Sequence, residues 1–194
     1  MPGAKPRLRL GDEPQANEAE RKTGIAPIIP HNARLLILGS LPGDASLAAQ
    51  RYYAHPRNRF WRLLGGILSS DLAAMDYADR LAVLTEVRIG LWDVVASAQR
   101  RGSLDTAMRA VTANPLAECI AGLPDLRAVA FNGASAAKIG RRALAGRAGL
   151  ALIDLPSSSP AHAAMSPAEK AARWAELAAY LDIETPLAAI PPYR

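Results

Sequence analysis

Four short polar segments contain the side chains with which this chain could do chemistry, and each follows an apolar run. The first joins Gly39-Ser-Leu-Pro-Gly-Asp44 to a stretch that holds Tyr53, Asn58 and two arginines. Glycine and proline directly after a buried strand predict a tight turn whose backbone N–H groups can meet an anion or a base edge. Aromatic rings beside arginines can stack a base and hold its phosphates. This segment therefore indicates nucleotide recognition.

Each of the other three polar segments can be interpreted in two ways. Asp93 follows an apolar run and is either a catalytic carboxylate or a helix cap, the commoner role for such a residue. Asn132 either shows a donor and an acceptor to a base edge or forms a turn before a glycine. In Leu155-Pro-Ser-Ser-Ser-Pro-Ala-His162, the hydroxyls can hold phosphates. His162 is either an acid, base or charge donor near neutral pH or an ordinary surface histidine.

Alternating strands and helices must position these segments. Four apolar runs bounded by Gly, Pro or Asn predict strands, and helical stretches lie between them. Three of the runs show little polar alternation, as in strands that are covered on both faces. This order predicts a parallel sheet with helices on both sides, whose ligands bind beyond the carboxyl ends of the strands. The expected strands are 34–38, 87–92, 127–131 and 150–155, and the expected helices are 60–68, 72–84, 104–109 and 134–145.

The clearest helix starts at Ser166. The order Ser166-Pro-Ala-Glu169 supplies a capping serine, a proline at the first helical position and a glutamate at the third. Five apolar residues then share one face of the helix, namely Ala171, Trp174, Leu177, Ala178 and Leu181. Phe60 and Trp61 open another expected helix, and we expect both rings to lie in the core.

Length and composition narrow the class of protein. The 194 residues, 50% of them hydrophobic, fit one domain with a core of its own. Residues 1–22 are polar and aperiodic, so we expect a flexible tail ahead of a single domain at residues 23–194. The apolar runs are too short to cross a bilayer, and the N-terminus lacks the apolar stretch of a signal peptide. These features predict a cytoplasmic chain with no membrane partner.

The cysteines, histidines and charged residues further restrict the class of protein. Cys119 is the only cysteine and there are three histidines, which excludes an internal disulfide and argues against a metal site. Lys and Arg number 23 against 18 Asp and Glu, and nearly all of the positive residues are arginines. The fixed fork of an arginine suits phosphates. The net charge of +5 therefore permits a nucleic-acid partner, although GC-rich genomes enrich arginine without any binding role.

Taken in order, the motifs resemble those of the uracil-DNA glycosylase superfamily. The nearest branch is its sixth family, the DNA-deoxyinosine or hypoxanthine-DNA glycosylases. The resemblance spans about residues 24 to 181. Its motifs are Leu35-Leu-Ile-Leu-Gly-Ser-Leu-Pro-Gly43, Tyr52-Tyr-Ala-His-Pro-Arg-Asn-Arg-Phe-Trp61, Gly90-Leu-Trp-Asp-Val-Val-Ala-Ser97 with Gly102-Ser-Leu-Asp105 after it, Phe131-Asn-Gly133 and Leu155-Pro-Ser-Ser-Ser-Pro-Ala161.

The resemblance implies both a fold and a reaction. The fold is a three-layer α/β/α sandwich around a mostly parallel, four-stranded sheet. The activity is that of a monofunctional glycosylase that flips a deaminated base, uracil or hypoxanthine, out of DNA and hydrolyses its N-glycosidic bond, which initiates base excision repair. It needs no metal or cofactor, and the expected partner of the monomer is double- or single-stranded DNA. Catalysis must stabilise an oxocarbenium-like sugar and an anionic base around a positioned water.

The resemblance departs from the better-known relatives at the position that activates water. Better-known relatives carry a water-activating Asp or Asn at the position of Leu41, and leucine cannot orient water. The first candidate for this role is therefore Asn58, and the second is Asp44, which is otherwise a cap of the turn. His162 stands where this branch usually has Asn, and as a donor it would stabilise negative charge on the leaving base.

The resemblance also assigns binding roles. Tyr53 aligns with the ring that stacks under the flipped base, and the serine-rich loop is expected to grip the DNA backbone. The implied base-binding residues are Gly39, Ser40, Leu41, Tyr53 and Asn132. The implied DNA-binding residues are Ser157, Ser158, Ser159, Pro160, Ala161, Arg57 and Arg59.

Two other classes of function stay open on the sequence. Gly133-Ala-Ser-Ala-Ala137 nearly matches the nucleophile elbow of serine hydrolases, and Ser135, Asp154 and His162 follow in the order of a triad. The missing second glycine weakens this interpretation. The other class is a non-catalytic DNA-binding module of the same fold, which the absence of an Asp at Leu41 favours.

Overall fold

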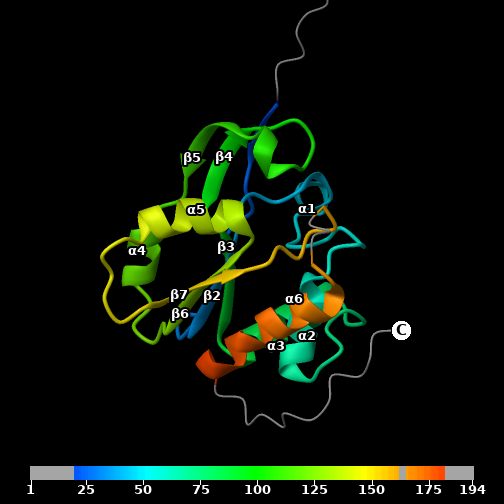
Figure 1. The fold of residues 1–194 in the computed structure, drawn as a ribbon, viewed down its shortest axis with the longest axis vertical. Helices are drawn as coiled ribbons and strands as arrows, with labels where there is room; N and C mark the ends of the chain where they lie inside the picture. The colour runs from blue at the N-terminus through cyan, green and yellow to red at the C-terminus, as the bar shows by residue number, and fades with distance from the viewer. Residues whose placement is uncertain (1–19, 162–164, 182–194) are drawn as a thin grey trace, which may run out of the picture.

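The fold is built around a four-stranded parallel sheet. The computed structural model describes residues 20–161 and 165–181. The order of the strands is β3-β2-β6-β7, and every pair is parallel (Figure 1). The strands are β2 (Leu35–Gly39), β3 (Ile89–Asp93), β6 (Ala128–Asn132) and β7 (Ala151–Leu155). Each lies within two residues of its expected position, so the predicted sheet is confirmed.

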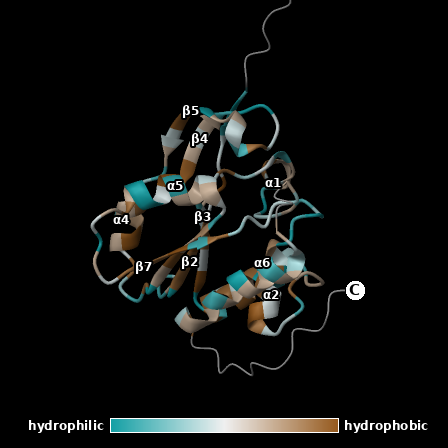
Figure 2. Ribbon diagram, viewed as in Figure 1, coloured by the Kyte–Doolittle hydropathy of each residue, from teal (hydrophilic) through white to brown (hydrophobic). Residues whose placement is uncertain are grey.

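Helices cover both faces of this sheet because alternate strand residues point to opposite sides. Leu35 and Ile37 contribute to one core, with α2 (Phe60–Leu68), α3 (Tyr77–Glu86) and α6 (Pro167–Ala175). Leu36, Leu38 and Phe131 contribute to the other core, with α4 (Leu116–Ala121) and α5 (Ala134–Ala143). Figure 1 shows these two helical layers, and Figure 2 shows apolar colour along the central strands between them. The predicted three-layer α/β/α sandwich is confirmed.

The order of the strands creates a switch point. From β2 the chain first adds β3 on one side and later adds β6 and β7 on the other side. Loops that leave β2 and β6 therefore diverge, and in open parallel sheets ligands bind at such a crevice beyond the carboxyl ends of the strands.

A second, antiparallel sheet corrects one expectation. It contains β1 (Arg21–Thr23), β4 (Val95–Gln99) and β5 (Arg109–Ala113) in the order β1-β4-β5. The helix expected over residues 104–109 is wrong. Only a 3-10 turn, Asp105–Ala107, forms there, because the chain then turns back to pair β5 with β4. Arg21 and Lys22, the last residues of the expected tail, pair in β1, whereas residues 1–19 lie outside the described residues.

Local hydrogen bonds explain where the helices begin. The helix expected from residue 72 starts at Tyr77, because Asp71 closes a separate turn by accepting from the N–H of Ala74. The capping box of α6 is confirmed, with 3.2 Å from the N–H of Glu169 to Ser166 Oγ and 2.8 Å for the reciprocal bond. A 3-10 helix (Glu176–Tyr180) follows α6. Phe60 and Trp61 are buried, as expected. Helix α1 (Asp44–Ala49) and α4 were not predicted.

Substitution of Gly140 tests how closely α5 packs against β6. A side-chain carbon at Gly140 would lie 2.2 Å from Cε1 of the buried Phe131 ring. We expect Gly140→Ala to lower the free energy of unfolding by roughly 2 kcal/mol, because the ring cannot move within a filled core. Urea denaturation measures this change.

Gly66 is the matched control, since a side-chain carbon there would meet nothing within 4 Å. Gly66→Ala is expected to raise the free energy of unfolding by roughly 0.5–1 kcal/mol through helix propensity alone. A similar gain for Gly140→Ala would contradict the close contact between α5 and β6.

Candidate active site

The polar segments that the sequence singled out meet at the carboxyl edge of the parallel sheet. Gly39 ends β2, Asp93 ends β3 beside it, and Asn132 ends β6. The loop of residues 156–161, here called the serine loop, follows β7. The segment that contains Tyr53 lies against this edge, since its Oη would be 3.4 Å from a side-chain carbon at Gly39. The structure therefore brings together the segments predicted to form a site.

A buried arginine holds the first loop in shape. Arg100 is fully buried, and its guanidinium donates to the carbonyl of Leu41 at 3.0 Å and to that of Pro42. Burial lowers the pKa of Arg100, and the nearby Asp105 partly opposes this effect. Ser40 Oγ donates to Asp105 Oδ1 at 2.7 Å, which joins the loop to the same group. No feature of the amino-acid sequence distinguishes Arg100 from the other arginines.

Leu41 and Asp44 have structural roles in this loop. The side chain of Leu41 is 5% exposed and belongs to one of the two cores, so only its backbone is available to a ligand. The carboxylate of Asp44 forms an ion pair with Lys22 of β1. The N–H of Asp44 also donates to Ser103 Oγ at 2.9 Å. Since its carboxylate is already paired, Asp44 is a weaker candidate for water activation than Asn58.

Asn58 is fixed at the start of α2. Its Oδ1 accepts from the N–H of Phe60 at 3.0 Å, and its own N–H donates to the carbonyl of His55 at 2.8 Å. The next N–H, that of Arg59, donates to the carbonyl of Ser158 at 3.0 Å, so Asn58 lies beside the serine loop. Within the described chain, the Nδ2 group makes no hydrogen bond. Asn58 can thus still donate to a ligand or a water and accept with the second lone pair of Oδ1.

Tyr53 forms a supported aromatic platform. Its ring stacks on that of Phe60, with 3.7 Å between centroids and 10° between planes. Phe60 in turn packs edge-on against Trp61 and Trp174. Tyr53 adopts a left-handed backbone conformation (φ 55°), which is uncommon for a bulky residue and concentrates at functional sites. Its hydroxyl is buried and has no hydrogen-bond partner among the residues that the structure describes, and burial raises its pKa.

Asp93 is a buried carboxyl group that, like the hydroxyl of Tyr53, lies close to Gly39. It is 3% exposed, and its Oδ2 has no hydrogen-bond partner within the described chain. The pKa of Asp93 is raised to about 7, chiefly by burial and in part by the charge of the nearby Asp105, while hydrogen bonding with Tyr52 and the charge of Arg100 oppose the rise. A side-chain carbon at Gly39 would lie 2.5 Å from Asp93 Oδ1, so this position requires glycine. No helix follows Asp93, because β4 begins two residues later, and the helix-cap interpretation is wrong.

Asn132 links the third and fourth segments. Its Nδ2 donates to Ser158 Oγ at 2.9 Å, and its Oδ1 accepts from the N–H of Ser158 at 2.8 Å. Both residues are buried. This reciprocal pair, here called the amide clamp, gives Asn132 a loop-fixing role that neither interpretation of the sequence included. The predicted contact with a base edge stays a prediction.

The serine loop is fixed at its base and exposed at its tip. Lys170 Nζ donates to the carbonyl of Ser157 and Trp174 Nε1 donates to that of Pro156, each at 3.0 Å. Pro160 and Ala161 are exposed. Ser159 accepts from the N–H of Ala161, and Ser157 accepts from that of Ser159. Arg57 and Arg59 are exposed beside this loop at the start of α2, whereas His162 lies outside the described residues.

Two residues of the serine hydrolase alternative, Ser135 and Asp154, lie in the described part of the chain. Asp154 Oδ1 forms an ion pair with Arg141 Nε at 2.9 Å, and the same guanidinium donates to the carbonyl of Leu152. Ser135 lies in the first turn of α5, which follows a strand without the second glycine of a nucleophile elbow. The carboxylate that a triad would need is therefore engaged elsewhere.

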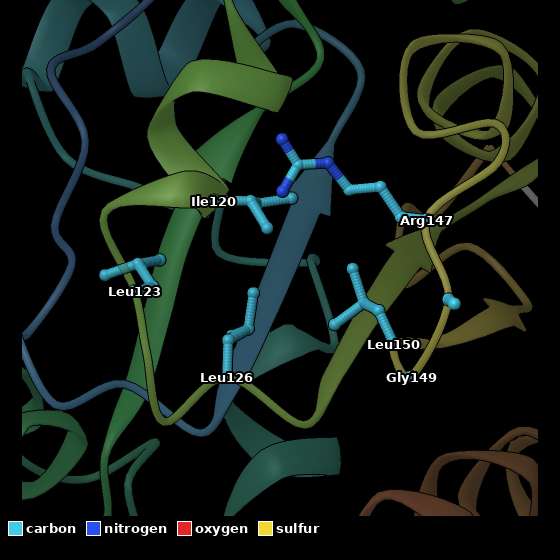
Figure 3. Close-up of a pocket in the computed structure, with 7 residues that line it drawn as sticks. Ile120, Leu123, Leu126, Arg147, Gly149 and Leu150 are labelled. Atoms are coloured by element: carbon cyan, nitrogen blue, oxygen red, sulfur yellow. The ribbon is translucent and has the colours of Figure 1, made fainter.

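Two pockets differ in their relation to this site. One, of about 340 Å³, lies at the opposite, amino-terminal edge of the sheet (Figure 3). Its only charged lining residue is Arg147, which bonds to the carbonyl of Ala117, and the others are Ile120, Leu123, Leu126, Ala148, Gly149 and Leu150. The other, of about 540 Å³, borders the serine loop and is lined by residues that include Gly133, Ser157 and Arg173. Only the second adjoins the polar segments.

No three His, Cys, Asp or Glu residues of the described chain form a group that could hold a metal ion. Within the same residues, no helix is both long and apolar enough to cross a membrane.

The structure is thus an α/β protein whose parallel sheet carries a candidate site at its carboxyl edge. An aromatic platform, a fixed polar loop and buried amide and carboxyl groups meet there. Residues 26–179 match the family model of the uracil DNA glycosylase superfamily. The chain therefore belongs to this superfamily, and it is an enzyme of the class that hydrolyses N-glycosyl bonds.

Individual relatives agree with this assignment. A protein of Methanosarcina barkeri named hypoxanthine DNA glycosylase is 44% identical over 113 residues, which cover 58% of this chain and 72% of the relative. A protein of the same name from Methanosarcina acetivorans is 40% identical over 115 residues, 59% of this chain and 73% of the relative. A solution NMR structure of a candidate uracil DNA glycosylase from M. acetivorans has a TM-score of 0.74 and 36% identity, covering 82% of this chain and 97% of that one.

The free energy of unfolding should depend on whether Asp93 is protonated. Because the pKa of Asp93 is raised to about 7, the folded state binds the proton more tightly than the unfolded state. The free energy of unfolding should thus fall as the pH rises from about 4 to about 7, by up to about 4 kcal/mol. Asp93→Asn should remove this fall, which urea denaturation across that pH range measures. The exposed Asp79→Asn is the control, and equal pH profiles for all three proteins would refute the buried carboxyl.

Proposed function

We propose that this chain is a monofunctional DNA glycosylase that flips hypoxanthine or uracil out of DNA and hydrolyses its N-glycosidic bond, the first step of base excision repair. It acts as a monomer on DNA in the cytoplasm. The observation that carries the proposal is the meeting of the Tyr53 platform, Asn58 and the amide clamp at the switch point of the sheet. The relatives named for hypoxanthine support that base as the main substrate.

Tyr53 and Asn58 have complementary roles in this proposal. The flipped base stacks on the ring of Tyr53, which Phe60 supports from the other side. Asn58 orients a water toward C1′ of the sugar through its amide. The base departs with the electron pair of the glycosidic bond, the water oxygen bonds to C1′, and the proton of the water ends on the base. An amide cannot accept that proton, so the reaction depends on stabilisation of the charges rather than on a general base.

The buried carboxyl suits this requirement when it is neutral. The departing base carries negative charge, and an ionised Asp93 near Tyr53 would repel that charge. The protonated carboxyl instead offers a donor and an acceptor. Asp93 faces Tyr52, Tyr53 and Arg100, and with a pKa near 7 it is protonated in part of the neutral pH range.

The serine loop is the proposed grip on the DNA backbone. The amide clamp holds this loop at Ser158, Lys170 holds it at the carbonyl of Ser157, and the exposed Arg57 and Arg59 stand next to it. Contacts with the DNA backbone fix the position of the DNA without reading its sequence.

Activity on defined lesions tests the proposal. The protein is incubated with oligonucleotides that carry a single hypoxanthine, uracil or xanthine, and abasic sites are then cleaved with alkali. Strand breaks are expected at hypoxanthine and, more slowly, at uracil. Breaks at no lesion would refute the proposed function and favour a non-catalytic DNA-binding module.

Substitution of Asn58 tests the role of its amide. Asn58→Ala is expected to lower the single-turnover rate by roughly 100-fold and to change the Kd for DNA by no more than about threefold. Asn58→Ser keeps an oxygen that can cap α2 but has no amide, so it should be as slow as Ala and as stable as the wild type. Equal losses of rate and affinity would assign the water to Asp44 or His162 instead.

The rate should also depend on Asp93. In the wild type, the single-turnover rate is expected to fall as the pH rises through about 7, where Asp93 loses its proton. Asp93→Asn, which stays neutral, should not show that fall. Identical pH–rate profiles for the two proteins would remove Asp93 from the mechanism.

A further inference from the structure

The aromatic platform stands on a segment that has no regular structure of its own. No helix or strand covers residues 50–54. Two residues of this segment adopt the left-handed backbone conformation, Gln50 (φ 50°) and Tyr53 (φ 55°). This conformation is unfavourable for residues other than glycine, so it persists only where the surroundings determine it. The proposed function uses the ring of Tyr53 and leaves unexplained what holds its backbone in this state.

Hydroxyl groups from two distant helices hold the N–H groups of the residues before and after Tyr53. The N–H of Tyr52 donates to Tyr77 Oη at 2.9 Å, and the N–H of Ala54 donates to Ser46 Oγ at 3.1 Å. Tyr77 is the first residue of α3, whereas Ser46 lies in α1. Backbone groups of such a segment need partners. These two bonds therefore supply what a helix or a strand would otherwise provide.

Both hydroxyls are themselves fixed in place. Ser46 is 6% exposed, and its carbonyl accepts from the N–H of Arg51 at 3.1 Å. The ring of Tyr77 packs edge-on against Trp61, with 6.0 Å between centroids, and the guanidinium carbon of Arg51 lies 5.4 Å from the centre of the same ring. Burial raises the pKa of Tyr77, so its hydroxyl keeps its proton at neutral pH. The two helices thus present these hydroxyls at fixed positions.

The position of the Tyr53 ring depends on this backbone. Its centroid lies 3.7 Å from that of Phe60, and a change in φ would swing the ring off this support. Misplacement of a reacting group by about 1 Å can cost roughly 100-fold in rate. We infer that Tyr77 and Ser46 are positioning residues, whose hydroxyls hold the backbone around Tyr53 and thereby place its ring for the flipped base. This inference rests on the proposed function and adds α1 and α3 to the elements that shape the site.

A double-mutant cycle tests the inference. Tyr77→Phe and Ser46→Ala each remove one hydroxyl, and each is expected to lower the single-turnover rate on a hypoxanthine duplex by roughly tenfold. In a Tyr53→Ala background, the same substitutions should change the rate by less than about twofold, because they act through a ring that is no longer present. Circular dichroism checks that every variant is folded. Tyr180→Phe is the matched control, since Tyr180 is half-buried against the same core as Phe60, and it should match the wild type.

A second readout needs no DNA. With fluorotyrosine in place of tyrosine, the fluorine NMR resonance of Tyr53 is identified by its absence from Tyr53→Phe, and the stacked Phe60 ring contributes to its chemical shift. Ser46→Ala and Tyr77→Phe are expected to move this resonance, whereas Tyr180→Phe should leave it in place.

Three results would overturn the positioning role. They are unchanged rates, equal losses with and without the ring of Tyr53, and a Tyr53 resonance that does not move. If the wild type excises no base, the proposed function fails, and the fluorine spectra still decide whether the two hydroxyls place the ring.

Discussion

The buried guanidinium of Arg100 is the interaction on which the catalytic edge depends. It satisfies the carbonyls of Leu41 and Pro42, which would otherwise be buried without donors at the end of β2. Asp105 lies 3.9 Å from it and accepts from Ser40, so the charge, the first loop and the turn between β4 and β5 form one unit. Removal of Arg100 would leave several buried groups unpaired at once, and such losses cost far more than a single surface hydrogen bond.

On the other side of the crevice, the amide clamp also pairs buried polar groups and thereby fixes a loop. Asn132 and Ser158 satisfy each other with two hydrogen bonds, and the loop that follows β7 is held without any regular structure of its own. Between these two fixed loops the protein retains polar atoms that lack partners among the described residues, Tyr53 Oη and Asp93 Oδ2. Buried polar groups are otherwise almost always paired, and exceptions cluster at functional sites. The rigid loops therefore keep the unpaired groups in place for a ligand.

The sequence predicted the parts of this structure that are encoded locally. Apolar runs bounded by Gly and Pro located the four parallel strands, and Ser166 with Glu169 located α6. It failed at β5, where all five residues are exposed and no alternation marks a strand. It also gave no partner for Asn132, because Ser158 is 26 positions away. Asp93 was misread for the same reason, since its burial is caused by Gly39 and the tyrosines rather than by its neighbours in sequence.

The burial of Leu41 explains why the proposed mechanism has the water held by a residue outside the first loop. Its side chain packs among the apolar residues of one core, next to Val95 and Ala98 of β4. An Asp at this position would place a carboxylate in that core, where burial is costly without a partner. The side chain of Leu41 in the first loop therefore serves the packing of the core, and the hydrogen bonds from Arg100 fix the backbone of the loop in this conformation. Asn58 lies outside this core. Its Oδ1 accepts from the N–H of Phe60 at the start of α2, and the N–H of the next residue, Arg59, donates to the carbonyl of Ser158. An amide there can orient water while the loop remains closed over its apolar neighbours.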